Sequence, residues 1–229
     1  MTRLAISNDP AAACGRAILD KLAPLAHPTL AVSGGSSPRK MFEWMAVQDF
    51  DWSKLHFYWV DERCVPPDHA DSNYRMTREA LLDRVRMAAV HRILGELDPA
   101  EAAARYTMEL PERFDMVHLG MGADAHTASL FPGLAEIADR EGRAAAVWVP
   151  KLNAHRITLL PRMILGADEI IVLAAGADKA KTLLEVFTEP QDPMSRPIQM
   201  VLNRATWFLD PPAASQLPIA VTTTGSGTA

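Results

Sequence analysis

The sequence has no long apolar run, few cysteines and no excess of positive charge. No stretch approaches the roughly 18 consecutive apolar residues that a membrane-spanning helix needs, and residues 1–5 lack the apolar core of a secretory signal. Lys and Arg number 23 against 28 Asp and Glu, a net charge of -5, whereas a nucleic-acid-binding surface requires an excess of cations. We therefore expect no membrane span, no nucleic-acid partner and a cytoplasmic location, while locally gathered cations would still suit a small anionic substrate.

Only two cysteines, Cys14 and Cys64, occur in the chain. Two thiols form neither a disulfide framework nor a paired-cysteine metal motif, which is typical of a reducing compartment. Cys64 follows Arg63, and a neighbouring cation favours the reactive thiolate. An isolated thiol beside one arginine is a weak signal, so a catalytic cysteine is the less favoured interpretation.

The chain is long enough for a substantial core. Its 229 residues are 48% hydrophobic, which suffices for one globular domain. We expect this single domain over residues 1–220, and no internal repeat is evident. Residues 221–229 (VTTTGSGTA) are polar and contain glycine, so we expect a disordered tail there.

Short apolar segments alternate with amphipathic ones. The expected strands are residues 29–33 (TLAVS), 56–60 (HFYWV), 114–119 (FDMVHL), 145–149 (AAVWV), 156–160 (RITLL) and 169–174 (EIIVLA). The expected helices are residues 39–48, 73–86, 99–110 and 178–187. Apolar strands that alternate with helices predict an α/β fold with a largely parallel sheet flanked by helices. The fourth and fifth strands instead predict a small antiparallel hairpin.

Polar and glycine-rich segments lie just after five of these strands. Ligands of an open α/β sheet bind outside the carboxyl ends of its strands, so these segments mark the expected site. They are SGGSSP at 33–38, DER at 61–63, GMGADAHTASLFPG at 120–133, PK at 150–151 and GADK at 176–179. Arg156 begins a strand, but an antiparallel hairpin returns it to the same edge, beside Lys151.

The stretch SGGSSP predicts a phosphate cradle. Gly34 and Gly35 let backbone N–H groups approach an anion, and the positive end of the next helix adds favourable charge. Either Ser36 or Ser37 is suited to cap that helix, and Pro38 suits its first turn. A tight turn into a helix explains the glycine pair equally well, because neither a dinucleotide fingerprint nor a Walker sequence is present.

Three cations belong to the same set of strand ends. Lys179 lies in the first turn of an expected helix, where a cation opposes the helix dipole unless it meets a bound anion. Lys151 and Arg156 are candidates for the same role. The alternatives stay open, since Lys179 can be a solvated surface lysine and Arg156 can pair with a carboxylate such as Glu169.

His126 is the candidate for proton transfer. A histidine, with an ordinary pKa of about 6.5, accepts a proton at neutral pH, and Asp124 is near enough in sequence to orient the ring or its loop. We expect His126 at the start of a short apolar helix, where a helix cap or a surface residue is the plain alternative. His155 is the nearest rival among the other histidines.

Two further chemistries have weaker signals. Ser129 follows His126 by three residues, one helical turn, but no G-x-S-x-G elbow presents a serine nucleophile. Conceivable metal ligands are Asp61, Glu62, Asp124 and His126. No H-E-x-x-H or H-x-x-E-H array supports them, so we expect no metal.

The order of the motifs resembles the 6-phosphogluconolactonase family across nearly the whole chain. The matching segments are SGGSSP, WVDER, SNY, GMGADAHTASLFPG, PKLNAHRIT, GADKAK and ATWFLDPPAASQL. The long fourth segment is highly specific, whereas SGGSSP and DER are shared with sugar-phosphate isomerases and deaminases. The resemblance implies a modified Rossmann-like fold and hydrolysis of 6-phospho-D-glucono-1,5-lactone to 6-phosphogluconate in the pentose phosphate pathway. It implies a small-molecule substrate, no cofactor and no metal.

The resemblance also implies roles for individual residues. His126 is the catalytic residue, with Asp124 beside it and Arg63 near the lactone. The phosphate-binding positions are Ser33, Gly34, Gly35, Ser36, Lys151, Arg156 and Lys179. Ala125 departs from the family, which usually has glycine there, and a positive φ at this position would cost alanine about 1 kcal/mol or more.

The expected mechanism is attack by a deprotonated water. His126 takes the proton, and Arg63 stabilises the oxyanion with a backbone N–H near Gly35 or Gly122. The nearest alternative is a glucosamine-6-phosphate deaminase, but that family has a glutamate where this chain has Phe131. A non-catalytic sugar-phosphate-binding protein is the other alternative. The sequence leaves the oligomeric state open between a monomer and a small homo-oligomer.

Overall fold

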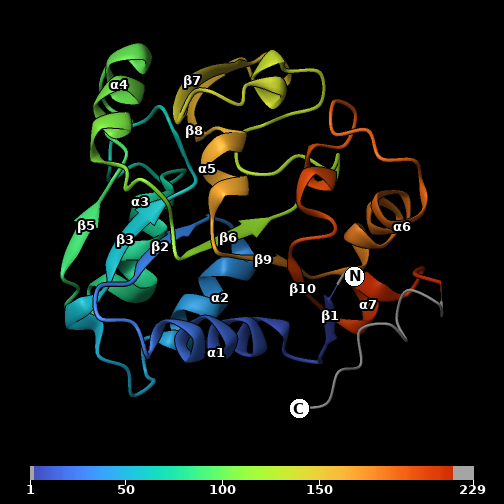
Figure 1. The fold of residues 1–229 in the computed structure, drawn as a ribbon, viewed down its shortest axis with the longest axis horizontal. Coiled ribbons are helices and arrows are strands. Elements are labelled where there is room, and N and C mark those ends of the chain that lie inside the picture. Colours follow the sequence, from blue (N-terminus) through green and yellow to red (C-terminus); the bar gives the residue numbers. More distant parts are fainter. Residues whose placement is uncertain (1–2, 219–229) are drawn as a thin grey trace.

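The computed structural model describes residues 3–218 and has a central sheet with helices packed around it (Figure 1). The seven strands lie in the order β1-β10-β9-β6-β2-β3-β5, and each neighbouring pair is parallel. They are β1 Arg3–Ile6, β2 Thr29–Val32, β3 His56–Trp59, β5 Ala89–His91, β6 Met116–Gly120, β9 Glu169–Ala174 and β10 Thr206–Leu209. The predicted α/β fold with a largely parallel sheet is confirmed.

A second, smaller sheet is antiparallel and has the order β4-β8-β7. Its strands are β4 Asp61–Arg63, β7 Ala144–Val149 and β8 Ala154–Leu159. β7 pairs with β8 along its whole length, which confirms the predicted hairpin. β4 follows β3 directly and pairs Arg63 with Arg156. The small sheet therefore begins at the carboxyl end of the central sheet and brings two arginines there.

The helices begin at sequence signals that match their first turns. They are α1 Pro10–Leu22, α2 Ser36–Met45, α3 Asn73–Thr77, α4 Pro99–Glu109, α5 Pro161–Gly166, α6 Ala180–Thr188 and α7 Pro211–Ala214. Short 3-10 turns are η1 Trp52–Lys54, η3 Ala135–Ala138, η4 Pro150–Leu152, η5 Ala177–Lys179 and η6 Pro197–Val201. Asp9, Asp98 and Asp210 each accept a hydrogen bond from a first-turn N–H, and a proline follows each of them. A carboxylate cap followed by proline satisfies a free donor and fixes φ for the helix.

The helix predicted at 73–86 is shorter and irregular. α3 ends at Thr77, a π-helical turn continues as η2 over Arg78–Leu82, and the chain then turns toward β5. Ser72 caps α3 by accepting a hydrogen bond from the N–H of Arg75 at 3.1 Å, so the predicted start is right. The predicted end is wrong because residues 83–85 form a turn, in which the N–H of Arg84 donates to the carbonyl of Leu81 at 2.9 Å.

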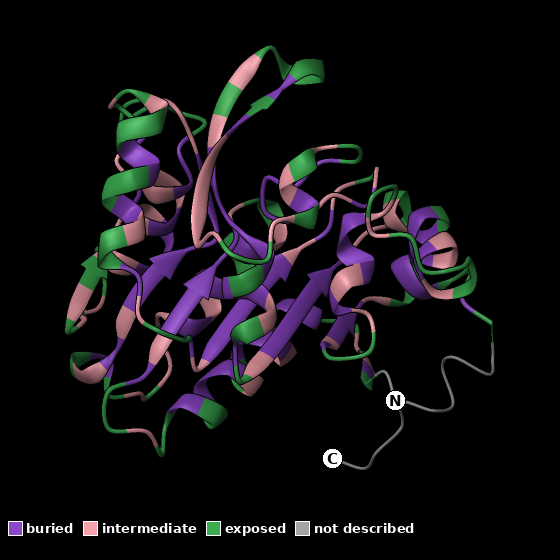
Figure 2. Ribbon diagram, turned by 45° about the horizontal axis from the view of Figure 1, so that its top comes forward, coloured by how far each residue is buried: buried purple, intermediate pink, exposed green. Residues whose placement is uncertain are grey.

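The central strands form the core of the molecule, and Figure 2 shows them buried, while the β7–β8 hairpin carries exposed segments. Leu30, Val117, Val172 and Trp207 lie on four neighbouring strands and are 0% exposed. Burial of one Val, Leu or Ile side chain contributes about 1.5–3 kcal/mol. The sheet is therefore a firm base for the polar segments that follow its strands.

Two further expectations concern the extent of the chain. The predicted disordered tail, residues 221–229, lies outside the described residues, and the single domain over 1–220 stays a prediction. Within residues 3–218, no helix has the length and apolar character needed to cross a membrane.

Candidate active site

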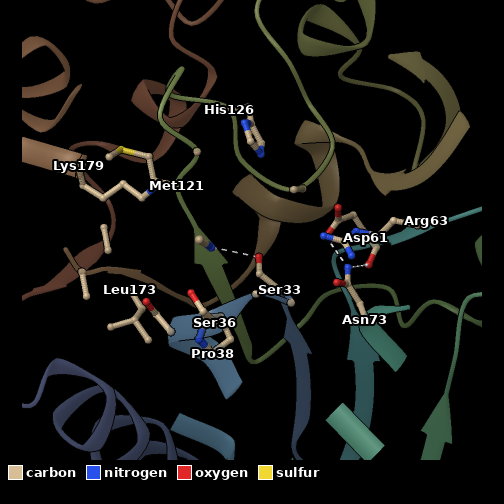
Figure 3. Close-up of a pocket in the computed structure, with 18 of the residues that line it drawn as sticks. Ser33, Ser36, Pro38, Asp61, Arg63, Asn73, Met121, His126, Leu173 and Lys179 are labelled. Carbon is tan, nitrogen blue, oxygen red and sulfur yellow. Dashed lines mark hydrogen bonds between the residues drawn. The ribbon is translucent and has the colours of Figure 1, made fainter. Parts of the chain in front are cut away.

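A cavity of about 240 Å³ lies at the carboxyl ends of the central strands. Its lining residues are Ser33, Gly34, Gly35, Ser36, Ser37, Pro38, Asp61, Arg63, Asn73, Gly120, Met121, Gly122, His126, Ala128, Arg156, Leu173, Ala174, Ala175 and Lys179. In Figure 3, His126 lies above Ser33 and Ser36, with Lys179 on one side and Arg63 on the other. Segments that are far apart in sequence therefore meet around one space.

Most of the predicted site residues belong to this lining, but two do not. Asp124 and Lys151 lie outside it, and the Nζ of Lys151 donates a hydrogen bond to Oδ2 of Asp124. Both therefore act on the cavity through a neighbour, since Asp124 also contacts His126.

The loop between β2 and α2 lines the cavity and leaves its backbone donors free. Among the described residues, none accepts a hydrogen bond from the N–H of Gly34, Gly35, Ser36 or Ser37. The prediction that one of the two serines caps α2 is wrong, because both already lie in its first turn and no side chain caps it. Free N–H groups at the positive end of a helix bind anions.

Both glycines of this loop are required by its geometry. Gly35 is the N-cap of α2 with φ of 118°, in the region that favours glycine. A Cβ at Gly34 would lie 1.9 Å from Oδ1 of Asn73, so only glycine lets the loop and α3 approach each other. The glycine pair thus shapes this wall of the cavity.

Lys179 adds a cation to the same cavity. It is the last residue of η5 and directly precedes α6, close to its predicted place in a first helical turn. Its side chain is 21% exposed, and Nζ lies 3.0 Å from Oδ2 of Asp178. The charge of Lys179 and the free N–H groups of α2 therefore line the same cavity, a combination whose chemistry suits an anion.

The segment that carries His126 is not a helix. Residues 123–134 form turns and a single bridge, so the expected short apolar helix is wrong. The chain is held instead by the small sheet, because the N–H of Ser129 donates to Oγ1 of Thr158 at 3.1 Å. The buried Oγ of Ser129 donates to Oδ2 of Asp61 at 2.6 Å, which gives a serine nucleophile no support.

The imidazole of His126 is fixed on several sides. Its Nδ1 lies 2.5 Å from Oδ1 of Asp124, and its ring stacks on Phe131 with centroids 4.1 Å apart. A Cβ at Gly122 would lie 2.0 Å from Nδ1, so the backbone also closes in on the ring. The side chain is 26% exposed, and Nε2 remains available for a substrate or water.

Asp124 carries a stable negative charge. Burial raises its pKa, but the hydrogen bonds from His126 and Lys151 outweigh burial and hold the pKa well below its usual range. An ionised Asp124 accepts from Nδ1 and thereby favours the tautomer of His126 with a free lone pair on Nε2. That nitrogen is the one suited to accept a proton.

Ala125 and Gly122 form the tight turn beneath this pair. Ala125 has φ of 61°, the positive φ whose cost for alanine the sequence raises. Its N–H donates to the carbonyl of Gly122 at 3.1 Å. The N–H of Gly122 donates to the carbonyl of His126 at 2.9 Å. The N–H of Gly122 itself is therefore used within the turn and is not free to serve as an oxyanion donor.

Two arginines and an aspartate line another wall. Asp61 is 5% exposed, and its Oδ2 lies 3.8 Å from Nη1 of Arg156. The predicted alternative partner of Arg156, Glu169, instead pairs with Arg3 and Lys21. Arg63 donates from Nη1 to the carbonyl of Asp71, and its buried Nε has no partner in the described part of the chain.

Glu62 and Asn73 hold this wall in place. The buried Glu62 carboxylate accepts from the N–H groups of Arg63, Asn73 and Tyr74, each at 2.8 Å, and from the Oγ of Ser72 at 3.0 Å. Burial nevertheless raises its pKa. The Nδ2 of Asn73 donates to the carbonyl of Asp61 at 2.9 Å.

Cys64 and a metal centre gain no support from this geometry. Burial, reinforced by Glu62 and Asp98, raises the pKa of Cys64 to about 11, so its thiol stays protonated at neutral pH. Within residues 3–218, no group of three or more His, Cys, Asp and Glu side chains is arranged to hold a metal ion.

Three residues of the site were not foreseen in their present roles. The sequence gives Asn73 no role, although it belongs to the matching segment SNY. It indicates Asp61 only as a conceivable metal ligand, and Phe131 only as the position where the deaminase family has a glutamate. Their contacts join positions far apart in the chain, such as Asp61 and Ser129. Local sequence patterns carry no signal for such pairs.

Comparison with known proteins gives consistent matches over most of the chain. The family model described as "Glucosamine-6-phosphate isomerases/6-phosphogluconolactonase" matches residues 4–209. A 6-phosphogluconolactonase of Treponema pallidum is 40% identical over 175 residues, covering 70% of this chain and 73% of the relative. One of Nostoc sp. is 38% identical over 206 residues, covering 83% and 85%. The crystal structure of a 6-phosphogluconolactonase from Shewanella baltica is 28% identical, with a TM-score of 0.83, and covers 92% of this chain and 97% of that one.

Proposed function

The chain belongs to the family of glucosamine-6-phosphate isomerases and 6-phosphogluconolactonases, and we propose that it hydrolyses 6-phospho-D-glucono-1,5-lactone to 6-phospho-D-gluconate. Relatives named 6-phosphogluconolactonase, up to 40% identical, support this substrate. One observation carries the proposal: a single cavity has the His126 imidazole on one side and, on another, the free amides of α2 with Lys179. A base and an anion-binding wall in one space suit a phosphorylated ester.

The reaction begins with water. Nε2 of His126 takes a proton from a water molecule as its oxygen bonds to C1 of the lactone, which leaves a negative charge on the carbonyl oxygen. Asp124 holds Nδ1 and stabilises the imidazolium formed. When the bond from C1 to the ring oxygen breaks, the imidazolium returns the proton to that oxygen. The product is the open-chain acid, which ionises at neutral pH.

Arg63 is the residue that faces the developing oxyanion in this proposal. Its position in the lining supports this role, and a donor of this kind contributes about 3 kcal/mol to transition-state stabilisation. Arg156, beside it across the β4–β8 pair, adds positive charge to the same wall.

The phosphate is proposed to bind at the opposite end. The free N–H groups of Gly34, Gly35 and Ser36 donate to its oxygens, Ser33 lines the same wall, and Lys179 balances the charge. Binding there holds C1 close to His126 and disfavours lactones without a phosphate. Lys151 is assigned a different role, since it pairs with Asp124.

The wider setting is also part of the proposal. We place the reaction in the pentose phosphate pathway and in the cytoplasm, which the two free cysteines support. The protein acts as a monomer or a small homo-oligomer. A net charge of -5 supports a small-molecule partner and not a nucleic acid.

A coupled assay tests the proposal. The lactone is generated enzymatically from glucose 6-phosphate, the protein is added, and 6-phosphogluconate formation is followed against spontaneous hydrolysis. We expect formation far above the background rate and no ammonia release from glucosamine 6-phosphate. A rate equal to the background, with folded protein, would refute the proposed activity.

A further inference from the structure

The ring of Phe131 lies against three side chains of the site. Its centroid is 4.1 Å from that of the His126 imidazole, with 25° between the planes. The Nζ of Lys151 lies 4.5 Å from the same centroid, and Cζ of Arg156 lies 5.5 Å from it. Phe131 is 5% exposed, so its ring is almost fully covered by neighbouring side chains.

Phe131 also connects the His126 segment to the small sheet. It packs with Val147 and Val149 of β7, with Leu134 against the cluster. β7 pairs with β8, which carries Arg156, and leads directly into η4, which carries Lys151. Phe131 belongs to the same loop as His126, and its ring packs that loop against the small sheet.

The imidazole has little freedom left when these contacts are combined. Asp124 fixes Nδ1, the backbone at Gly122 closes in on the same atom, and Phe131 sets the plane of the ring. The segment itself lacks helical hydrogen bonds that would hold it. The stacked ring, packed on the small sheet, adds to the hydrogen bonds of Ser129 that hold the segment.

We infer that Phe131 is a positioning residue for the proton transfer, which keeps Nε2 of His126 directed at the lactone and presents a π face to the imidazolium that forms. This inference rests on the proposed function. Aromatic faces attract cations, and Lys151 and Arg156 already lie near this one. A ring at this position thus accommodates a third positive charge during the reaction.

The test compares substitutions of Phe131 with a packing control. Phe131→Leu removes the ring and is expected to lower kcat about 10- to 100-fold while KM changes less than about 3-fold, because misplaced catalytic groups slow the chemical step. Phe131→Tyr retains the ring and is expected to restore kcat to within about 3-fold of the original. Phe114→Leu removes a buried ring that contacts Tyr58 and lies outside the cavity lining, and it is expected to lower thermal stability with little change in kcat. If Phe131→Leu fails to fold, Phe131→Met replaces it.

A second readout does not depend on activity. Ring-current shifts of the His126 imidazole protons, assigned by comparison with a His126→Gln variant, report the stacking directly in NMR spectra. We expect upfield shifts in the original protein and in Phe131→Tyr, and their loss in Phe131→Leu. The inference is overturned if Phe131→Leu keeps its kcat or its imidazole shifts, or if Phe114→Leu loses as much kcat. Absence of lactone hydrolysis in the original protein would refute the proposed function instead, and the NMR comparison would still decide the stacking.

Discussion

At the scale of single residues, the site depends on a carboxylate and an imidazole that are two positions apart. Such a short separation brings Asp124 and Nδ1 of His126 together only because the chain makes a tight turn between them, with Ala125 at φ of 61°. The turn also uses the N–H of Gly122. Local backbone conformation, and not a helix, therefore directs the imidazole of His126 toward the cavity.

The strained alanine gives a stability prediction. Ala125→Gly relieves a left-handed conformation that costs alanine about 1–2 kcal/mol. The variant also loses a buried methyl group and gains conformational freedom in the unfolded chain, and these two effects together cost about as much. We expect the unfolding free energy to change by less than about 0.5 kcal/mol. Urea denaturation measures it.

A buried helical alanine provides the matched control. Ala102 on α4 is 0% exposed, and Ala102→Gly gains no relief of strain, so it is expected to cost about 2 kcal/mol. Equal losses in the two variants would show that Ala125 is not strained.

At the scale of elements, the N-terminus of α2 and Lys179, which directly precedes α6, line the same cavity. We expect Lys179→Ala to raise KM about 10- to 100-fold, the effect of losing a charged hydrogen bond to phosphate, with kcat within about 3-fold. Lys181→Ala is the control, because Lys181 lies in the first turn of α6, two residues after Lys179, with its side chain 82% exposed. Steady-state kinetics of both variants measures the difference, and an unchanged KM for Lys179→Ala would assign Lys179 to the surface.

Strand β6 carries a buried histidine that makes stability depend on pH. His118 is 0% exposed, neither ring nitrogen has a partner among the described residues, and burial lowers its pKa to about 3. The folded protein therefore keeps this ring neutral, while the unfolded chain takes up a proton below pH 6.5. The contribution of neutral His118 to the free energy of unfolding is complete above pH 6.5. It is lost as the pH falls toward 3, at about 1.4 kcal/mol per pH unit.

A variant isolates this contribution. Between pH 7 and pH 5, we expect the unfolding free energy of His118→Leu to fall by about 2 kcal/mol less than that of the original protein. Urea denaturation at both pH values measures the difference. Identical losses in the two proteins would mean that His118 is protonated in the folded state.

At the scale of the whole molecule, the site lies where two sheets meet. The parallel sheet supplies the anion-binding loop and the segment that carries His126, whereas the antiparallel sheet supplies Arg63 and Arg156. β4 links them because it continues directly from β3. Neither sheet alone encloses the cavity.

The parts that sequence could predict are those with strong local patterns. Strands β2, β3, β6 and β9 are apolar runs, and the polar segments after them could be located at one edge of the sheet. Strands β1 and β5 lie at the two edges of the sheet and consist mostly of exposed or half-buried residues, so they form no apolar run. Strand β10 is as short as β2 and β3, and its apolar residues WFL are a signal that could have found it. The turns around His126 and the role of Asn73 depend on contacts between distant segments, such as Ser129 with Asp61, which no local pattern encodes.

Lactone hydrolysis by a His126→Ala variant tests the central claim most directly. The variant and the original protein are compared in the coupled assay at neutral pH, with spontaneous hydrolysis subtracted and folding checked by circular dichroism. Removal of the general base is expected to lower kcat about 10²- to 10⁴-fold, with KM changed little because the phosphate wall is intact. A folded variant that turns over the lactone at nearly the original rate would contradict the assignment of His126 as the base.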